Sequence, residues 1–258
     1  MSQKESSEQG QGQEEEQLGQ MGFMSHFGEL KSCLFKAVLA TSIMTAVAFT
    51  QIKLIWVFLL SPLPDKATGS LQNIAPTEVL VMDFKVAILV GIFAASPFIF
   101  WQIWKFIAPA LFNKERTMVW PIVFMSVFFF IGGAAFAFFI VLPASFQFLH
   151  SYSAGITQQQ WTQSNYLGFT MRMILAFAIM FQLPVVTWVL ATLKLITSQF
   201  LISQARIAIV IIFILAAILT PPEVISQLML ALPLILLYGF SILIARWVNP
   251  THKESIDV

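Results

Sequence analysis

The chain alternates between long apolar stretches and short polar segments. A helix needs about 20 apolar residues to cross the roughly 30 Å hydrocarbon core of a bilayer. Six stretches approach or exceed this length, which predicts an all-α, polytopic membrane protein with six transmembrane helices. The fifth and sixth helices are expected to be short, because the fifth stretch has only about 15 residues, or roughly 22 Å of helix, and polar residues weaken the start of the sixth. The predicted spans are Cys33–Phe49, Phe84–Trp104, Val119–Leu142, Thr170–Leu193, Ala205–Leu219 and Val224–Ala245.

Both ends of the chain are polar and are expected to lie outside the membrane domain. Residues 1–22 are rich in Gln, Glu, Ser and Gly, a composition that predicts a disordered tail, and residues 251–258 form a second short tail. The membrane domain between them, residues 23–250, begins with the segment FMSHFGELKSCL. Its apolar residues recur at helical spacing, which predicts an amphipathic interfacial helix that leads into the first span. These residues are Phe23, Phe27, Leu30 and Leu34.

The distribution of Lys and Arg predicts the orientation, because cytoplasmic segments of membrane proteins carry an excess of these residues. With both termini in the cytoplasm, the cytoplasmic side holds most of the basic residues that lie near the spans. The outer connections are then the long ones, Thr50–Asp83 and Pro143–Phe169, and the first begins with QIKLIWVFLL, which is expected to form a half-inserted helix. The cytoplasmic set is Lys31, Lys36, Lys105, Lys114, Arg116, Lys194, Arg206, Arg246 and Lys253, and the outer set is Lys53, Lys66, Lys85 and Arg172.

Composition agrees with lipid as the solvent and excludes several functional classes. Hydrophobic residues make up 58% of the 258 residues and charged residues 10%, with a mean hydropathy of +0.81. The net charge of +1 provides no field to attract nucleic acid. Cys33 is the one cysteine, and the three histidines are far apart, so no disulfide framework or metal-binding spacing is present. The motifs of nucleotide binding and of serine hydrolases are also missing from the sequence.

A short polar turn between the second and third predicted spans is the strongest candidate for a recognition site. This turn, Lys105–Arg116, has the sequence KFIAPALFNKER and is too short to hold a domain, so it offers only a surface. Glu115 near its tip and Glu29 at the entry to the first span are both expected on the cytoplasmic face. Two such acids can bracket a cationic ligand, and the planar fork of a guanidinium group bonds a carboxylate in pairs. A solvated acid paired with Lys114 or Arg116 is the alternative for Glu115, because exposed ion pairs are common.

Other polar and small residues lie within or between the spans. Gln182 is the main polar residue near the centre of a span, and an amide in lipid needs a hydrogen-bond partner. It is expected to bond either another helix or the carbonyl that Pro184 leaves free. Glu223 lies at the turn between the fifth and sixth spans, where an acid favours the start of the following helix. Gly132 and Gly133 are expected to form a close helix-packing face.

Four motifs together resemble the TatC family, the polytopic subunit of the twin-arginine protein translocase, over about Phe23 to Asn249. They are HFGELK at the entry to the first span, SPFIFWQIWKFIAPALFNKER around the first cytoplasmic turn, Gln-x-Pro in the fourth span, and LTPPEVISQ at the last hairpin. The second and fourth motifs are specific in combination. Six spans with both termini inside also match the topology of this family.

The resemblance implies a receptor of the bacterial cytoplasmic membrane, not an enzyme, with no cofactor or metal. Proteins of this family bind the paired arginines of the signal peptide on a folded cargo protein. They recruit single-span TatA-like and TatB-like subunits, self-associate in a multi-subunit complex, and pass cargo by means of the proton-motive force. By motif match, the signal-binding residues fall on Glu29, Lys31, Phe106, Pro109 and Glu115, the partner-binding or intramembrane polar residues on Gln182, Thr220, Glu223 and Gln227, and the structural prolines on Pro62, Pro97, Pro184, Pro221 and Pro222.

The chain departs from the family pattern at three positions. Lys31 replaces a usual Arg and lacks its planar fork, Gln182 replaces a frequent Glu, and Glu223 replaces a usual Asp. A titrating acid is therefore not essential at position 182 in this protein. The rival class is a secondary transporter or channel for a small solute, which places charged or polar groups around a midplane cavity. Gln182 is the main group of that kind near the centre of a span.

Overall fold

The computed structural model describes residues 28–63, 71–73, 75–111, 119–153, 162–220 and 224–249. These ranges are almost entirely helical, with a single β-bridge between Gln72 and Thr162, which confirms the all-α class. The predicted tails, residues 1–22 and 251–258, lie outside the described residues. The helices are a first helix Gly28–Thr50, α2 Ile52–Leu59, α4 Pro76–Leu111, α5 Val119–Phe136, the π-helix η2 Ala137–Val141, α6 Leu142–Ser153, α7 Gln163–Met180, α8 Leu183–Thr192, α9 Ser198–Leu219 and α10 Val224–Val248.

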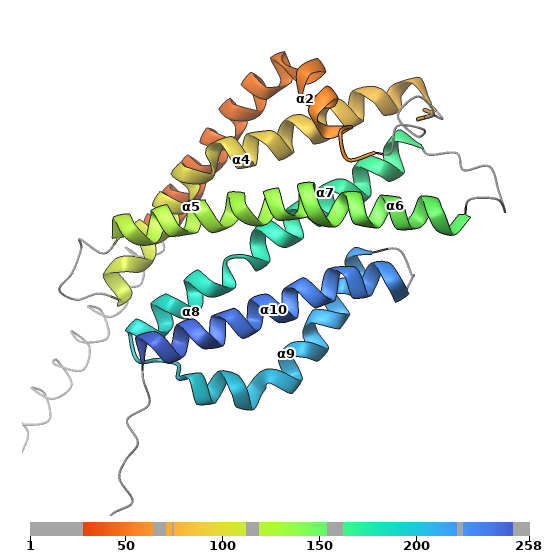
Figure 1. The fold of residues 1–258 in the computed structure, drawn as a ribbon. Coiled ribbons are helices and arrows are strands. Elements are labelled where there is room, and N and C mark those ends of the chain that lie inside the picture. Colours follow the sequence, from red (N-terminus) through yellow and green to blue (C-terminus); the bar gives the residue numbers. More distant parts are fainter. Residues whose placement is uncertain are drawn as a thin grey trace, which may run out of the picture.

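Six helical segments of the described chain are long and apolar enough to cross a membrane, which confirms the six predicted spans. They run alternately between two ends of a bundle (Figure 1). The first end holds the start of the first helix, the end of α4, the start of α5, the α8–α9 connection and the end of α10; we call it the α4–α5 end. The second end, where α7 and α10 begin, we call the α7 end. That the α4–α5 end faces the cytoplasm remains a prediction.

The helices extend beyond the predicted spans, most of all in the middle of the chain. The second, third and fourth spans are Thr77–Ile107, Val119–Tyr152 and Gln163–Thr192, with 31, 34 and 30 residues. At 1.5 Å per residue the longest is about 51 Å, well above the roughly 30 Å of a bilayer core. The helix that contains the fifth span, α9, has 22 residues and begins at Ser198, seven residues before the predicted start of the span. That the fifth and sixth spans are short within the membrane stays a prediction. Hydropathy marks the part of a helix that suits lipid, whereas backbone hydrogen bonds continue into polar flanking residues.

The predicted long connection Pro143–Phe169 is wrong in large part, because most of its described residues are helical. The third span continues from α5 through η2 into α6, and α7 begins at Gln163. Pro143 has no N–H, and in α geometry its ring would clash with the carbonyl of Phe139. In the wider π-helix the N–H of Leu142 bonds the carbonyl of Ala137, and this geometry carries the helix past the proline.

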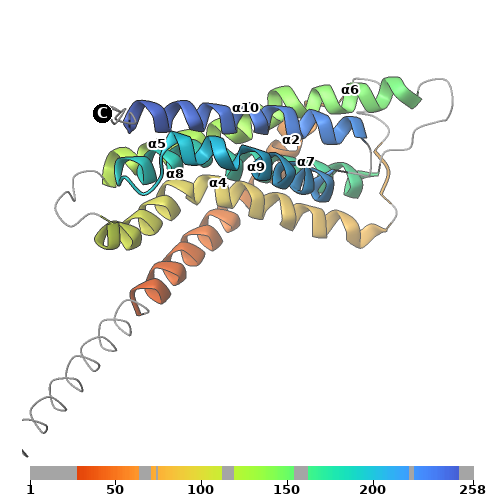
Figure 2. The same cartoon turned by 90° about the horizontal axis from the view of Figure 1, so that it is seen from below.

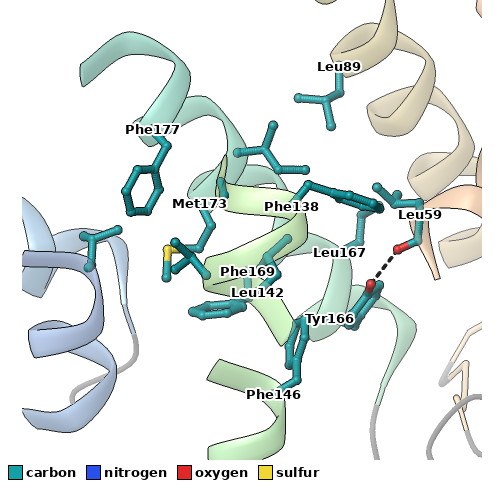
Figure 3. Packing of buried hydrophobic residues seen from close by; sticks show 14 of the residues in the cluster. Leu59, Leu89, Phe138, Leu142, Phe146, Tyr166, Leu167, Phe169, Met173 and Phe177 are labelled. Carbon is teal, nitrogen blue, oxygen red and sulfur yellow. Dashed lines mark hydrogen bonds between the residues drawn. The ribbon is translucent and has the colours of Figure 1, made fainter. Parts of the chain in front are cut away.

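The core lies where α4, η2, α6, α7 and α10 meet, and Figure 3 shows its aromatic centre. Phe146, Tyr166 and Phe177 are among the largest fully buried side chains. The hydroxyl of Tyr166 donates a 2.6 Å hydrogen bond to the carbonyl of Leu59, the last residue of α2. A buried hydroxyl needs such a partner, and this bond fastens the short α2 to α7.

The first helix is the least packed of the spans. Figure 2 shows that it runs at an angle to the others and that its start lies farthest from them. Near its other end Phe49 stacks on Phe84 of α4, with ring centroids 4.8 Å apart. The helix predicted to follow it is confirmed as α2, and Pro62 is buried in the turn just after α2. Insertion of α2 into the membrane remains a prediction.

Candidate functional site

The candidate acids of the signal-binding site belong to the α4–α5 end. Glu29 and the neighbouring Lys31 are exposed on the first helix. Glu115 lies outside the described residues, in the segment that joins Leu111 of α4 to Val119 of α5. The structure places Glu29 at the end of the bundle where α4 ends and α5 begins, and it does not define the distance between the two carboxylates.

The end of α4 carries the other residues of this candidate site. Phe106 is half-buried, and Pro109 falls in the last turns of the helix, although its side chain is not among those described. The ammonium group of Lys105 lies 5.6 Å from the centre of the Trp101 ring, a cation–π contact. The first residues of the polar turn predicted at Lys105–Arg116 therefore form the last two turns of α4. Aromatic residues and the aliphatic stem of Lys105 continue the apolar surface of the helix there.

Gln182 belongs to a small polar cluster that joins three helical segments. Its Nε2 donates a 3.0 Å hydrogen bond to the carbonyl of Ser126 in α5. The hydroxyl of Ser126, which is fully buried, accepts a 2.8 Å bond from Nε1 of Trp104 in α4. The structure thus selects the interhelical bond for Gln182 over a bond to the carbonyl that Pro184 leaves free. Polar groups without water are stable when they pair in this way.

The position of Gln182 follows from the proline two residues later. Pro184 lacks an N–H and would clash with the carbonyl of Met180 in a continuous α-helix. The fourth span breaks at Phe181 and Gln182, and α8 restarts with Pro184 buried in its first turn. Proline is well suited to that position because the first N–H groups of a helix have no internal partner. The Gln-x-Pro motif therefore sets where the amide meets α5.

A second of the predicted structural prolines lies inside α4. Pro97 is exposed, and it leaves the carbonyl of Phe93 without its usual helical N–H partner. The hydroxyl of the buried Ser96 donates a 2.7 Å hydrogen bond to that carbonyl. The dipeptide Ser96-Pro97 therefore keeps α4 continuous in an environment that offers no water to the freed carbonyl.

Two of the predicted hairpin residues bond carbonyls of α9. Thr220 is 6% exposed, and its hydroxyl donates a 2.8 Å bond to the carbonyl of Ala216. Nε2 of the half-buried Gln227 donates a 3.0 Å bond to the carbonyl of Phe213, which joins α10 to α9. Pro221, Pro222 and Glu223 lie outside the described residues. Thr220 and Gln227 thus each bond a different carbonyl of α9, and they do not bond each other.

A groove of about 700 Å³ separates the first helix from α4. Its lining includes Thr41, Ser42 and Thr45 from the first helix and Phe84 and Ile88 from α4. The hydroxyls of Thr41 and Ser42 each donate a 2.9 Å bond to a carbonyl four residues earlier, so they are satisfied within their own helix. The groove is consequently an apolar surface. Among the described residues, no group of three or more His, Cys, Asp and Glu side chains could hold a metal ion.

The helical order and these motifs agree with one protein family. The family model described as TatC, Sec-independent protein translocase protein, matches residues 25–233, most of the chain. The chain belongs to the TatC family. The described spans make it an integral membrane protein of this translocase family.

Curated relatives and solved structures of the TatC family extend the match. The chain is 41% identical over 187 residues to the Sec-independent protein translocase protein TatC of Helicobacter pylori, which covers 72% of this chain and 75% of the relative. It is 37% identical over 227 residues to the TatC of Desulforapulum autotrophicum, covering 87% and 84% of the two chains. A crystal structure of the twin arginine translocase receptor TatC superimposes with a TM-score of 0.79 and 34% identity, covering 86% of this chain and 99% of that chain.

One polar pair of this TatC-family chain is missing from the sequence predictions. Nε1 of Trp56 in α2 donates a 2.6 Å hydrogen bond to Oδ1 of Asp83 in α4. Hydropathy places Asp83 in a connection, one residue before the predicted second span. The structure places it inside the helical span that begins at Thr77. A lone acid beside a span, with a tryptophan in the preceding amphipathic segment, is the signal that points to such a pair.

Proposed function

We propose that this protein is the receptor component of a twin-arginine translocase in the bacterial cytoplasmic membrane. It binds the twin-arginine signal peptide of folded cargo proteins and recruits TatA-like and TatB-like single-span subunits for export driven by the proton-motive force. The observation that carries this proposal is the match to a solved twin arginine translocase receptor, which covers 99% of that chain. Both termini are cytoplasmic in this proposal, as the distribution of Lys and Arg predicts.

The proposed site for the signal peptide lies at the α4–α5 end. Glu29 and Glu115 accept the paired guanidinium groups, because a carboxylate and a guanidinium form two parallel charge-assisted hydrogen bonds. The exposure of Glu29 supports this assignment, as do the end of α4 and the start of α5, which flank Glu115 in the sequence and lie at the same end of the bundle. Lys31, Phe106 and Pro109 shape the surrounding surface.

The proposed partner contacts use polar groups at membrane depth. Gln182 and Gln227 each donate one described bond within the protein. A carboxamide has a second N–H and an oxygen with two lone pairs, so each side chain has capacity for a partner helix. Thr220 and Glu223 belong to the hairpin beside Gln227. Association of several copies of this chain, each with its own single-span partners, forms the complete receptor.

A binding measurement with a twin-arginine peptide tests the signal-binding site. Glu115→Gln should weaken binding by about 1.5–3 kcal/mol, or roughly 10–150-fold, the scale of a hydrogen bond to a charged group. Glu115→Lys should abolish binding, because it places a like charge beside the guanidinium groups. Fluorescence anisotropy of a labelled peptide, with the purified full chain in bilayer nanodiscs, gives the dissociation constants.

Glu78→Gln is the matched control, since Glu78 is an acid in the first turn of α4, at the α7 end of the bundle. This variant should bind the peptide with unchanged affinity. A peptide in which both arginines are replaced by glutamine should bind the normal protein weakly. Unchanged affinity of the Glu115→Lys variant for the twin-arginine peptide would refute the assignment.

A further inference from the structure

The groove between the first helix and α4 runs from an end where the two helices touch to an end where they separate. At the first end the rings of Phe49 and Phe84, which both line the groove, stack 4.8 Å apart. A Cβ atom added to Gly91 of α4 would lie 2.8 Å from the backbone nitrogen of Thr45, so the helices cross in close contact there. Beyond this crossing the first helix departs from the bundle toward the α4–α5 end (Figure 2).

The groove has the length and the surface that suit a lipid acyl chain. Its lining on the first helix extends from Ala37 to Phe49, twelve residues or about 18 Å. The acyl chains of one leaflet fill half of the roughly 30 Å hydrocarbon core, or about 15 Å. Only 6% of the apolar part of the first helix is buried within the chain, so the walls of the groove are open to lipid. The hydroxyls of Thr41 and Ser42 bond carbonyls of their own helix and do not require a polar occupant.

Lys31 lies on the groove side of the first helix, beyond the end where the helices separate. Positions 31, 38 and 45 are two turns of helix apart and share one face, and both Val38 and Thr45 line the groove. Lys31 is exposed, about 10 Å along the helix from Val38. Glu29 is two residues, or about 200° of rotation, from Lys31, so it is attached to the other side of the helix. The groove face of the first helix therefore leads to a cation.

We infer that this groove binds an anionic phospholipid, with an acyl chain along the wall from Val38 to Phe49 and the phosphate at Lys31. A lysine ammonium binds phosphate as a point charge, and cations beside a membrane attract anionic lipids. Phosphatidylcholine supplies the same acyl chains without net charge, so Lys31 distinguishes the two lipids. The inference goes beyond the proposed function, because it assigns a lipid ligand to the chain. The bound lipid supports the first helix, which has few contacts of its own, against α4.

Photoreactive lipid tracers test this site. Phosphatidylglycerol and phosphatidylcholine, each with a diazirine in one acyl chain, are added separately to phosphatidylcholine vesicles that contain the full-length protein. After irradiation, mass spectrometry of the digested protein locates the labelled residues. Phosphatidylglycerol should label the groove roughly five-fold more than phosphatidylcholine, the scale of one cation beside an anionic lipid. Labelling at Leu232 and Leu236, exposed residues of α10, should not differ between the tracers.

Variants at two lysines separate the phosphate contact from the net charge. Lys31→Gln should remove the preference for phosphatidylglycerol, whereas Lys31→Arg should retain it because the charge remains. Lys36→Gln is the matched control, since Lys36 is an exposed cation of the same helix about 140° of rotation from Lys31. This control should keep the preference. Both lysines are exposed, and circular dichroism checks that the helices remain.

A second pair of variants tests the place of the acyl chain. Ser42 lines the groove, so Ser42→Phe should fill part of it and lower labelling there by both tracers. Ile43 is exposed and lies about 100° of rotation away, so Ile43→Phe should leave groove labelling unchanged. Equal labelling of the groove in these two variants would show that the acyl chain does not occupy it.

Equal labelling of the groove by the two tracers in the normal protein overturns the inference. So does a preference that survives Lys31→Gln, or one that Lys36→Gln removes equally. Benzoylphenylalanine at position 38 identifies the occupant directly: a phospholipid adduct supports the inference, and a crosslink to a second copy of the chain overturns it. No signal peptide or partner subunit is present in these assays, so their failure leaves the binding test at Glu115 unaffected, and the reverse also holds.

Discussion

Gly132 and Gly133 are neighbours in α5, yet the structure gives them opposite surroundings. A Cβ atom added to Gly133 would lie 2.6 Å from the carbonyl oxygen of Phe177 and 2.8 Å from the Cβ of Phe181. A Cβ atom added to Gly132 would find nothing within 4 Å. The pair therefore allows the same substitution to be compared at two adjacent positions, one against α7 and one away from it.

The two substitutions change the free energy of unfolding through the same helix propensity and differ only in the packing around the new methyl group. Replacing Gly by Ala within a helix is worth about 0.8–1.0 kcal/mol in favour of Ala, and this gain applies to both sites. At Gly133 the new methyl group meets a backbone carbonyl that cannot move without displacing α7, and overpacking of this kind costs about 1–3 kcal/mol. We expect Gly132→Ala to be neutral or stabilising, and Gly133→Ala to be less stable than it by about 1–3 kcal/mol.

Unfolding of the purified full chain in mixed micelles measures this difference. The two variants and the normal protein are titrated with sodium dodecyl sulfate, and tryptophan fluorescence follows the loss of tertiary contacts. The midpoint for Gly133→Ala should fall below the midpoint for Gly132→Ala, while circular dichroism should show equal helix content in both folded states. Equal midpoints for the two variants would refute the close approach of α5 and α7 at Gly133.

Three further outcomes follow from the topology and the polar bonds. Cysteines placed at Asn113 and at Gln159 in a cysteine-free background should react with an impermeant maleimide from opposite sides of the membrane, and labelling from one side would refute the predicted orientation. Gln182→Leu should lower stability in the same unfolding assay by about 0.6 and at most about 2 kcal/mol, the range for hydrogen bonds between membrane helices; a loss above 4 kcal/mol would contradict this estimate. Tyr166→Phe should cost about 1–2 kcal/mol, because the buried carbonyl of Leu59 loses its donor, and an unchanged midpoint would show that this bond does not contribute.

Hydropathy was sufficient to predict the spans but not the helices that contain them. The six apolar stretches mark the spans because lipid selects side chains directly. The ends of the helices depend instead on where backbone bonds can continue, which apolar content does not report. Pro143 illustrates the difference, since a proline in a polar region suggests a connection, whereas η2 and α6 form a continuous helix around it.

The sequence also does not identify the hydrogen-bond partners of the polar residues. The need of Gln182 for a hydrogen bond was predictable from its depth, but the choice of Ser126 depends on how α5 and the fourth span are rotated against each other. The same rotation brings Gly133, and not Gly132, against α7. Both positions satisfy the sequence pattern of a small-residue face, so only the packed structure distinguishes them.

This limit has a physical cause in the membrane environment. In water, burial separates apolar from polar side chains, and a helix shows its inner face in its sequence. In lipid both faces are apolar, so the few polar residues carry most of the information about rotation. Gln182 and Trp104 obey this rule and point to other helices of the protein.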